Sequence, residues 1–126
     1  MQKGRTSMIV GIGTDLIEIE RVVRACERRA FLLRVFSKQE QENIEKHKHM
    51  AADNFAVKEA VVKMFGEGFR GIKPNEIEVL RDELGKPYVN LYGEAKKRKE
   101  QLGITKVHVT ISNTKELSSA YVIGES

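Results

Sequence analysis

Apolar residues change their spacing along this chain, and the changes mark out helices and strands. Helical spacing of apolar residues covers 16–26 and 50–65. Short apolar runs, most of them alternating with polar residues, predict strands over 8–13, 77–80, 88–91, 107–111 and 120–123. A short helix is expected over 93–102. The mixed order of helices and strands predicts an α+β fold.

Caps and turn-forming residues set the ends of these elements. Gly66 follows the long helix and predicts its C-terminal end. Residues 37–40, with the sequence SKQE, have the form of a capping box, which predicts a helix start and gives Glu40 a structural role. The glycine and proline of 85–87 predict a tight connection between two strands, and 114–116 are expected to close a hairpin.

Length and composition describe one folded domain. The 126 residues, of which 40% are hydrophobic, are enough to bury a core without disulfides. Residues 1–7 are expected to be a flexible leader or a cloning remnant, which leaves 8–126 as a single domain. No apolar run approaches the roughly 20 residues that cross a bilayer, and the single Cys26 suits a reducing compartment. These features favour a cytoplasmic protein that has no membrane partner.

Basic residues gather in two places, and the net charge of +4 favours anionic partners. Between residues 20 and 34 five arginines face two glutamates, and 96–99 is a second basic run. For the first group an acidic protein partner and a solvated helix face both stay open, whereas the second run favours a solvated face. Nucleic-acid binding is the main alternative function, but no aromatic residues gather beside the basic ones, so we expect no nucleic-acid partner. A dinucleotide-binding turn at Gly11 and Gly13 ranks lower, because the third glycine of that fingerprint is missing.

Candidate chemistry gathers around the long helix. Glu59 and Lys63 lie one turn apart in an otherwise apolar stretch, and a buried charge needs a partner. Asp15 is expected in a glycine-flanked turn directly after the first strand, where it could meet Glu59. Two carboxylates repel each other unless a cation lies between them, and Mg²⁺ prefers hard oxygen ligands of this kind. From the residues alone this metal hypothesis stays open, because any two acids can be paired on paper.

Two motifs resemble the signature motifs of a known enzyme family. The first is GIGTDLIEIER at 11–21, and the second is FAVKEAVVK at 55–63. Their order, their separation and the length of the chain are similar to those of the holo-acyl-carrier-protein synthases, the short members of the 4′-phosphopantetheinyl transferase superfamily. The likeness continues through 77–80, 85–87 and 109–112, so it covers nearly the whole predicted domain.

The resemblance implies a fold, a reaction and two metal ligands. The implied fold is a mostly antiparallel sheet packed against a long central helix. The implied reaction transfers the 4′-phosphopantetheine arm of coenzyme A to a serine of apo-acyl carrier protein and releases adenosine 3′,5′-bisphosphate. Asp15 and Glu59 match the family residues that hold Mg²⁺, for which Mn²⁺ can substitute, and Lys63 matches a lysine that contacts phosphate. Glu59 is also a candidate for removing the serine proton, so Glu59 and Lys63 are the expected catalytic residues.

Further residues are expected to contact coenzyme A. They are Lys58, Lys63, Gly66, Gly68, Gly85, Lys86, Pro87, Ser112 and Asn113. For Lys58 two interpretations stay open, a contact to coenzyme A or a side chain that extends to solvent. The chain departs from the family pattern at Asn113, where a histidine is usual, and at Asn54, where an arginine is frequent. Asparagine can hydrogen-bond the nucleotide or a phosphate but cannot carry a proton as histidine does, so no general base is expected at Asn113.

The resemblance also implies protein partners. Acyl carrier proteins are strongly acidic, and Arg21, Arg24 and Arg28 are spaced along one face of the predicted first helix, so they are expected to dock the carrier. Members of the family are homotrimers with an active site at each subunit boundary, and Asp15 of one chain is expected to approach Glu59 of its neighbour. The strands over 107–111 and 120–123 are candidates for packing at the trimer centre, although a monomer core explains them as well.

Overall fold

The structure, a computed structural model, describes residues 6–126 and confirms the α+β prediction. Its helices are α1 (Ile19–Ala25), α2 (Arg29–Val35), α3 (Lys38–Lys46), α4 (Met50–Phe65) and α5 (Gly93–Gln101), with a 3-10 turn, η1, at Pro74–Glu76. Its strands are β1 (Ile9–Glu18), β2 (Ile77–Arg81), β3 (Pro87–Leu91), β4 (Lys106–Asn113) and β5 (Leu117–Glu125). The predicted leader over 1–7 lies mostly outside the described residues; within them, Ser7 Oγ donates a hydrogen bond to Glu125 Oε2 at 3.0 Å.

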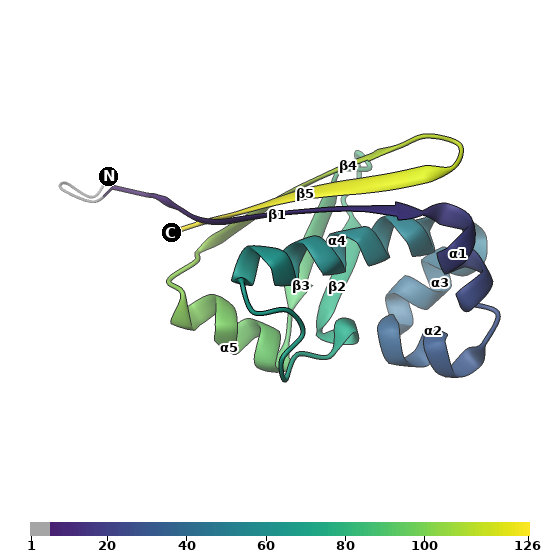
Figure 1. Ribbon diagram of the computed structural model, residues 1–126, viewed down its shortest axis with the longest axis horizontal. Coiled ribbons are helices and arrows are strands. Elements are labelled where there is room, and N and C mark those ends of the chain that lie inside the picture. Colours follow the sequence, from purple (N-terminus) through teal and green to yellow (C-terminus); the bar gives the residue numbers. More distant parts are fainter. Residues whose placement is uncertain (1–5) are drawn as a thin grey trace.

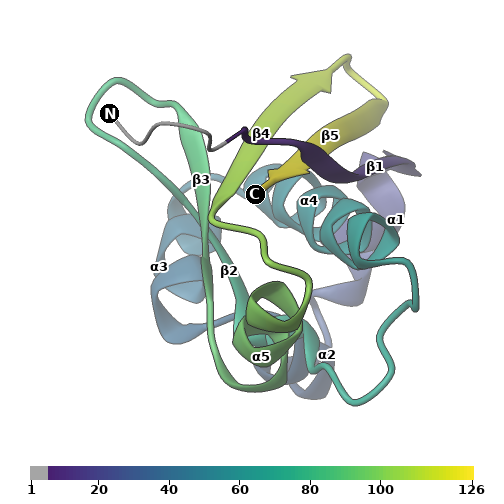
Figure 2. The same cartoon turned by 90° about the vertical axis from the view of Figure 1, so that its left-hand side faces the viewer.

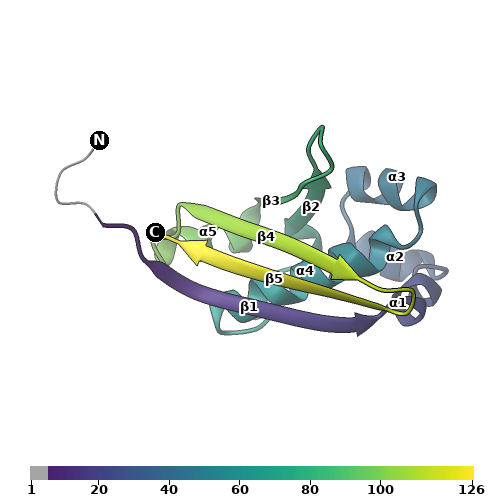
Figure 3. The same ribbon diagram turned by 90° about the horizontal axis from the view of Figure 1, so that it is seen from above.

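Long antiparallel strands form the larger sheet, in the order β1-β5-β4. β5 lies in the middle and pairs with both neighbours, as Figure 3 shows from above. α4 crosses one face of this sheet, and α1, α2 and α3 gather at one end of the molecule (Figure 1). The expected arrangement of an antiparallel sheet on a long central helix is therefore confirmed.

β1 is longer than its sequence pattern predicts, and this corrects the position of Asp15. The strand continues to Glu18, so the first helix begins later than predicted. The segment from Thr14 to Glu18 pairs with β5, and Asp15 lies opposite Ala120 inside the sheet instead of in a turn. Pairing with β5 supplies hydrogen bonds along the whole segment, which overrides the helical spacing of its apolar residues.

Gly11 and Gly13 allow β1 to lie very close to α4. A Cβ atom on Gly13 would collide with the backbone carbonyl oxygen of Ala60, and one on Gly11 with that of Met64. These glycines therefore serve the packing of a strand against a helix backbone and do not form the turn that the sequence suggested. The contact brings the segment around Asp15 next to the middle of α4.

α4 is enclosed on most of its circumference. The three-stranded sheet covers one side, β2 and β3 lie along another, and the N-terminal helices cover its first turns (Figures 1 and 2). Nearly all of its residues are buried, which accounts for apolar residues all round the helix. Its predicted end is confirmed at Gly66, where φ is +94°, a left-handed conformation that glycine adopts without strain.

The N-terminal helices form a second, smaller core against the start of α4. Its buried residues include Val22, Val35, Phe36 and Ile44. The predicted capping box at the start of α3 is confirmed: Glu40 N donates to Ser37 Oγ at 3.2 Å, and Ser37 N donates to Glu40 Oε1 at 2.9 Å. The sequence pattern does not predict α2, because its 7 residues are too few to display a helical period.

The C-terminal half follows the sequence prediction closely. The four predicted strands and the helix among them all form. In the loop that joins β2 to β3, Asp82 Oδ1 accepts hydrogen bonds from the backbone N–H groups of Leu84 and Lys86, both at 2.9 Å. β3 lies beside β4 in Figure 2, so the smaller sheet extends the layer around α4. Within residues 6–126, no helix combines the length and the apolar character that crossing a membrane requires.

Candidate active site

Asp15, Glu59 and Lys63 form one group at the crossing of β1 and α4, which we call the acid–lysine cluster. Asp15 alternates with the exposed residues of β1 and so projects from the face that α4 covers. Lys63 Nζ donates a hydrogen bond to Asp15 Oδ1 at 3.0 Å. Glu59 lies one helical turn before Lys63, on the same side of α4. The structure thus brings together the two predicted metal ligands and the predicted phosphate contact.

Charges in the acid–lysine cluster are incompletely balanced. Burial raises the pKa of Glu59, the negative charge of Asp15 raises it further, and the positive charge of Lys63 opposes both. The Asp15 side chain is only 13% exposed, and its Oδ2 atom is buried without a hydrogen-bond partner among the described residues. Two neighbouring carboxylates, one of which has an unpartnered buried oxygen, favour the binding of a cation.

One chain is sufficient to bring Asp15 near Glu59, which corrects the expectation that the two come from neighbouring chains. The close packing of Gly13 on Ala60 sets this approach, because Gly13 lies just before Asp15 and Ala60 directly follows Glu59. In the part of the chain that the structure describes, no three His, Cys, Asp or Glu side chains gather as a metal site. The acid–lysine cluster thus offers a pair of carboxylates, as the sequence predicted, and not a larger cage.

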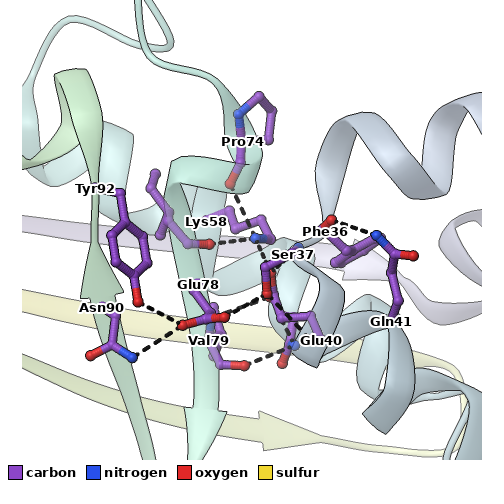
Figure 4. Close-up of polar contacts among 12 residues, drawn as sticks. Phe36, Ser37, Glu40, Gln41, Lys58, Pro74, Glu78, Val79, Asn90 and Tyr92 are labelled. Carbon is purple, nitrogen blue, oxygen red and sulfur yellow. Dashed lines mark hydrogen bonds and ion pairs between the residues drawn. The ribbon is translucent and has the colours of Figure 1, made fainter.

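Lys58 fits neither interpretation that the sequence left open, because its ammonium group lies in the interior. The side chain is 0% exposed, and Nζ donates to Glu40 Oε1 at 2.8 Å, to the Pro74 carbonyl at 3.1 Å and to the Ile77 carbonyl (Figure 4). All three N–H groups of the ammonium are therefore used within the protein. Lys58 neither extends to solvent nor has a free donor for coenzyme A.

Glu40 is the counter-ion of Lys58 and the centre of a buried polar network. Besides Lys58, three groups donate to its carboxylate: Ser37 N at 2.9 Å, Asn54 Nδ2 at 3.0 Å and Val79 N at 3.2 Å. The sequence predicted the structural role of Glu40 but missed its ion pair. The available signal was a lysine in the most apolar part of a helix, which requires a buried counter-ion.

Glu78 extends this network to β3. Its carboxylate accepts hydrogen bonds from Ser37 Oγ at 2.7 Å, Asn90 Nδ2 at 3.1 Å and Tyr92 Oη at 3.1 Å (Figure 4). Burial alone would raise the pKa of Glu78, but these hydrogen bonds and the charge of Lys58 outweigh it, and the pKa is lowered. The network therefore joins α3, α4, β2 and β3, and among its described members only the Oδ1 atom of Asn54 is buried without a hydrogen-bond partner.

The residues predicted to contact coenzyme A fall into two groups. Gly66 and Gly68 are exposed and directly follow the turn of α4 that carries Lys63, so they adjoin the acid–lysine cluster. Lys86 and Pro87, next to Gly85, instead line a groove of about 350 Å³ between the β2–β3 loop and β4. We call this the hairpin groove.

Ser112 and Asn113 lie at the end of β4, away from the acid–lysine cluster. β5 separates β4 from β1, so two strand spacings of about 4.8 Å lie between the strand of Asn113 and that of Asp15. Asn113 turns towards α4, where its Nδ2 donates to Asp53 Oδ1 at 3.1 Å. Ser112 is exposed on the other face of the sheet. Within one chain, the predicted coenzyme A contacts therefore lie on opposite flanks of α4: Gly66 and Gly68 on one side, and the hairpin groove and Asn113 on the other.

The three arginines predicted to dock a carrier protein lie close together but not on one helix. Arg21 and Arg24 belong to α1, whereas Arg28 lies in the connection to α2. All three are exposed and line one shallow hollow of about 400 Å³. The three arginines therefore cluster as predicted, but they do not lie on the face of a single helix.

The basic run over 96–99 lies on α5, where Lys96 and Lys97 are exposed and Arg98 and Lys99 are half-buried. Lys97 pairs with Glu94 at 3.3 Å, and Arg98 pairs with Glu67 at 3.1 Å. Acidic neighbours thus balance half of the run, which supports the solvated-face interpretation and weakens the nucleic-acid alternative.

Comparison with known proteins gives a consistent result. The model of the 4′-phosphopantetheinyl transferase superfamily matches residues 11–122. A protein of Lachnoclostridium phytofermentans named holo-[acyl-carrier-protein] synthase is 64% identical over 118 residues, covering 94% of this chain and 97% of that relative.

Solved structures extend the similarity to the fold. The crystal structure of holo-[acyl-carrier-protein] synthase from Neisseria meningitidis has a TM-score of 0.85 and 31% identity, covering 94% of this chain and 100% of that one. A holo-(acyl-carrier-protein) synthase from Bacillus anthracis, in complex with coenzyme A (3′,5′-ADP), has a TM-score of 0.78 and 32% identity, covering 94% and 98%.

Proposed function

Because the chain belongs to the 4′-phosphopantetheinyl transferase superfamily, and within it to the holo-[acyl-carrier-protein] synthases, we propose that it transfers the 4′-phosphopantetheine arm of coenzyme A to a serine of apo-acyl carrier protein. The observation that carries this proposal is the acid–lysine cluster at the crossing of β1 and α4. In the reaction the serine oxygen bonds to the β-phosphorus, the pyrophosphate bond breaks, and adenosine 3′,5′-bisphosphate leaves.

Asp15 and Glu59 are the residues that would hold Mg²⁺, with Mn²⁺ able to substitute. The fit is supported by the unpartnered Oδ2 of Asp15 and by the raised pKa of Glu59, since a divalent cation satisfies the first and relieves the repulsion behind the second. When bound, the ion would supply charge neutralisation at the phosphoryl oxygens.

The side chains of the cluster have separate roles in this reaction. Lys63 Nζ, with its side chain 54% exposed, can exchange its bond to Asp15 for a phosphate oxygen and stabilise the charge that develops there. Glu59 is the candidate acceptor of the serine proton, because its raised pKa makes it a stronger base than an ordinary carboxylate. Gly66 and Gly68 would let the backbone approach the phosphates of the nucleotide beside Lys63.

A second copy of the chain would complete the coenzyme A site. The acid–lysine cluster lies on one flank of α4, while the hairpin groove and Asn113 lie on the other. A ligand that contacts both groups must therefore pass from one copy to the next. This division supports a homotrimer whose active sites lie at subunit boundaries.

The outer face of the three-stranded sheet is the surface on which such copies would pack. No helix covers it in Figure 3, and its exposed apolar residues include Ile12 at 61%, Leu16 at 64% and Tyr121 at 56%. In the strands over 107–111 and 120–123, which were predicted to pack at the trimer centre, Val109 and Val122 instead face the core of the monomer. Leu16→Glu should yield monomers by light scattering after gel filtration, and an unchanged trimer would exclude this face.

Arg21, Arg24 and Arg28 are the proposed docking surface for the acidic carrier protein. An apolar pocket of about 430 Å³ adjoins them, lined by Arg21 together with Val22, Phe31 and Phe55. The rate of modification should fall steeply as salt rises, since charge attraction is screened beyond about 8 Å at physiological ionic strength. A second-order rate that does not depend on salt would contradict docking here.

Cys26 is compatible with the cytoplasmic location that we propose. It is half-buried, and burial raises the pKa of its thiol to about 11, so the reactive thiolate is disfavoured. A single inert thiol needs no oxidising compartment for folding.

Mass spectrometry tests the transfer itself. Apo-acyl carrier protein incubated with coenzyme A, Mg²⁺ and the enzyme should gain about 340 Da at one serine. A carrier with that serine replaced by alanine should gain nothing, and EDTA should stop the gain until Mg²⁺ or Mn²⁺ is restored. An unchanged carrier mass contradicts the proposed function, whereas a gain that EDTA does not affect contradicts only the metal site.

A further inference from the structure

A buried carboxylate without a role in the proposed reaction holds the end of the β4–β5 hairpin. Asp53 lies in the first turn of α4 and is 5% exposed. Its Oδ1 atom accepts a hydrogen bond from Ser118 Oγ at 2.6 Å and another from Asn113 Nδ2 at 3.1 Å. Both donors are distant from Asp53 in sequence, so this carboxylate ties the hairpin to the central helix.

The contact determines which atom of the Asn113 amide faces Asp53. An aspartate carboxylate at neutral pH only accepts hydrogen bonds, and so does the carbonyl oxygen of an asparagine. Asn113 must therefore turn its NH₂ group to Asp53, because a flipped amide would place two acceptors against each other.

The other half of the Asn113 amide is open. The residue is exposed, and no described residue donates a hydrogen bond to its Oδ1 atom. Because the amide group is planar, anchoring its nitrogen sets the direction of its oxygen. The Oδ1 atom that Asn113 offers to a ligand is thus an acceptor, so its partner is an N–H or O–H group and not a phosphate oxygen.

Resting on the function proposed above, we propose that Asp53 is a positioning residue that presents the carbonyl oxygen of Asn113 to an N–H or O–H donor of coenzyme A. The sequence allowed Asn113 to bind either nucleotide or phosphate, and the orientation of the amide gives its carbonyl oxygen a donor group of the ligand as its partner. Coenzyme A carries such donors at the 6-amino group of adenine, at the ribose 2′-hydroxyl and along its pantetheine arm.

Steady-state kinetics of single and double variants test the coupling. Asn113→Ala should raise KM for coenzyme A about 3- to 10-fold, as expected for one lost hydrogen bond, and should leave kcat nearly unchanged. Asp53→Ala should raise KM similarly, and the double variant should be no worse than Asn113→Ala, because Asp53 acts through Asn113. Asp53→Asn keeps an acceptor for the Asn113 amide and should restore KM towards the wild type. Ser118→Ala is the matched control: it removes the other hydrogen bond to Asp53 and should lower stability without changing KM. Multiplying effects of Asp53→Ala and Asn113→Ala would overturn the proposal.

Analogues of coenzyme A identify the donor. Dephospho-coenzyme A lacks the 3′-phosphate, and its KM penalty should be the same in the wild type and in Asn113→Ala. An analogue with hypoxanthine in place of adenine lacks the 6-amino group, and its penalty should disappear in Asn113→Ala if that amine is the donor; a persistent penalty assigns the donor to the ribose 2′-hydroxyl or the pantetheine arm, which a 2′-deoxy analogue separates. A dephospho-coenzyme A penalty that disappears in Asn113→Ala would mean a phosphate contact and would overturn the proposal.

Nuclear magnetic resonance tests the amide orientation without turnover, so a failure of the proposed function stays distinguishable. In the free protein, the side-chain NH₂ protons of Asn113 should exchange slowly with solvent, and they should exchange faster in Asp53→Ala, which removes the acceptor. Exchange that Asp53→Ala leaves unchanged would overturn the orientation whatever the activity.

Discussion

Helix α4 carries two lysines that each pair with a carboxylate, and the two pairs differ in almost every other respect. Lys58 and Glu40 meet at 2.8 Å with both side chains 0% exposed. Lys63 and Asp15 meet at 3.0 Å, but the lysine is 54% exposed and one oxygen of the aspartate has no partner. Two lysines that are five positions apart on one helix therefore belong to a fully buried pair and to a partly exposed pair.

Burial and hydrogen bonding explain why one lysine–carboxylate pair has a structural role and the other is available for chemistry. Glu40 receives donors at both oxygens, so the charge of Lys58 is compensated and cannot be offered to a ligand. Asp15 receives one donor, and Glu59 beside it has a raised pKa, so this group gains by binding a cation or an anionic substrate. Completeness of the hydrogen bonds, more than residue type, separates the two pairs.

Lys58→Met provides the strongest test of this contrast. The change removes one partner of a buried ion pair and leaves the Glu40 carboxylate without its counter-ion, so the free energy of unfolding should fall by about 3–5 kcal/mol. Urea denaturation followed by circular dichroism measures it. The matched control is Lys63→Met on the same helix, which should cost less than about 1 kcal/mol because the lysine of that pair is 54% exposed. Equal losses in the two variants would remove the distinction.

Glu59→Gln should produce the opposite result, with activity lost and the fold retained. The amide keeps the shape of the side chain but removes a metal ligand and the candidate base, so kcat/KM should fall at least about 100-fold. Unfolding by urea should show no loss of stability, since a carboxylate repelled by Asp15 has been removed. Glu45→Gln, at an exposed position of α3, is the control and should keep full activity. Wild-type turnover in Glu59→Gln would refute the metal and base roles.

The sequence predicted the fold well wherever the signal was local. The capping box at Ser37, the end of α4 at Gly66 and the strands of the C-terminal half each depend on nearby residues, and each is confirmed. The extension of β1 to Glu18 was missed, because pairing with β5, about a hundred residues further along, decides it.

At the site, the sequence predicted the acid–lysine cluster correctly but did not predict the buried pair of Lys58 and Glu40. Residue type and the family motifs identified Asp15, Glu59 and Lys63, and the structure brings them together. The same motif made Lys58 a candidate ligand contact, because its partner Glu40 comes from α3 and nothing in the sequence of α4 reveals it. Which lysine of a motif faces the interior depends on tertiary contacts.

The smallest expected effect is a difference in how pH changes stability at two carboxyls. The pKa of Glu78 is lowered from 4.5, so the folded protein binds fewer protons there than the unfolded chain, and stability is lost as pH falls below about 4.5. The pKa of Glu59 is raised from 4.5, so the folded protein holds its proton longer, and stability declines as pH rises above that value. The free energy of unfolding, measured with urea from acid to neutral pH, tests this difference. Glu78→Gln should reduce the loss of stability at acid pH, whereas Glu59→Gln should reduce the decline in stability above pH 4.5. Changes of the same sign in both variants would mean that the two carboxyls do not differ as the buried network and the acid–lysine cluster require.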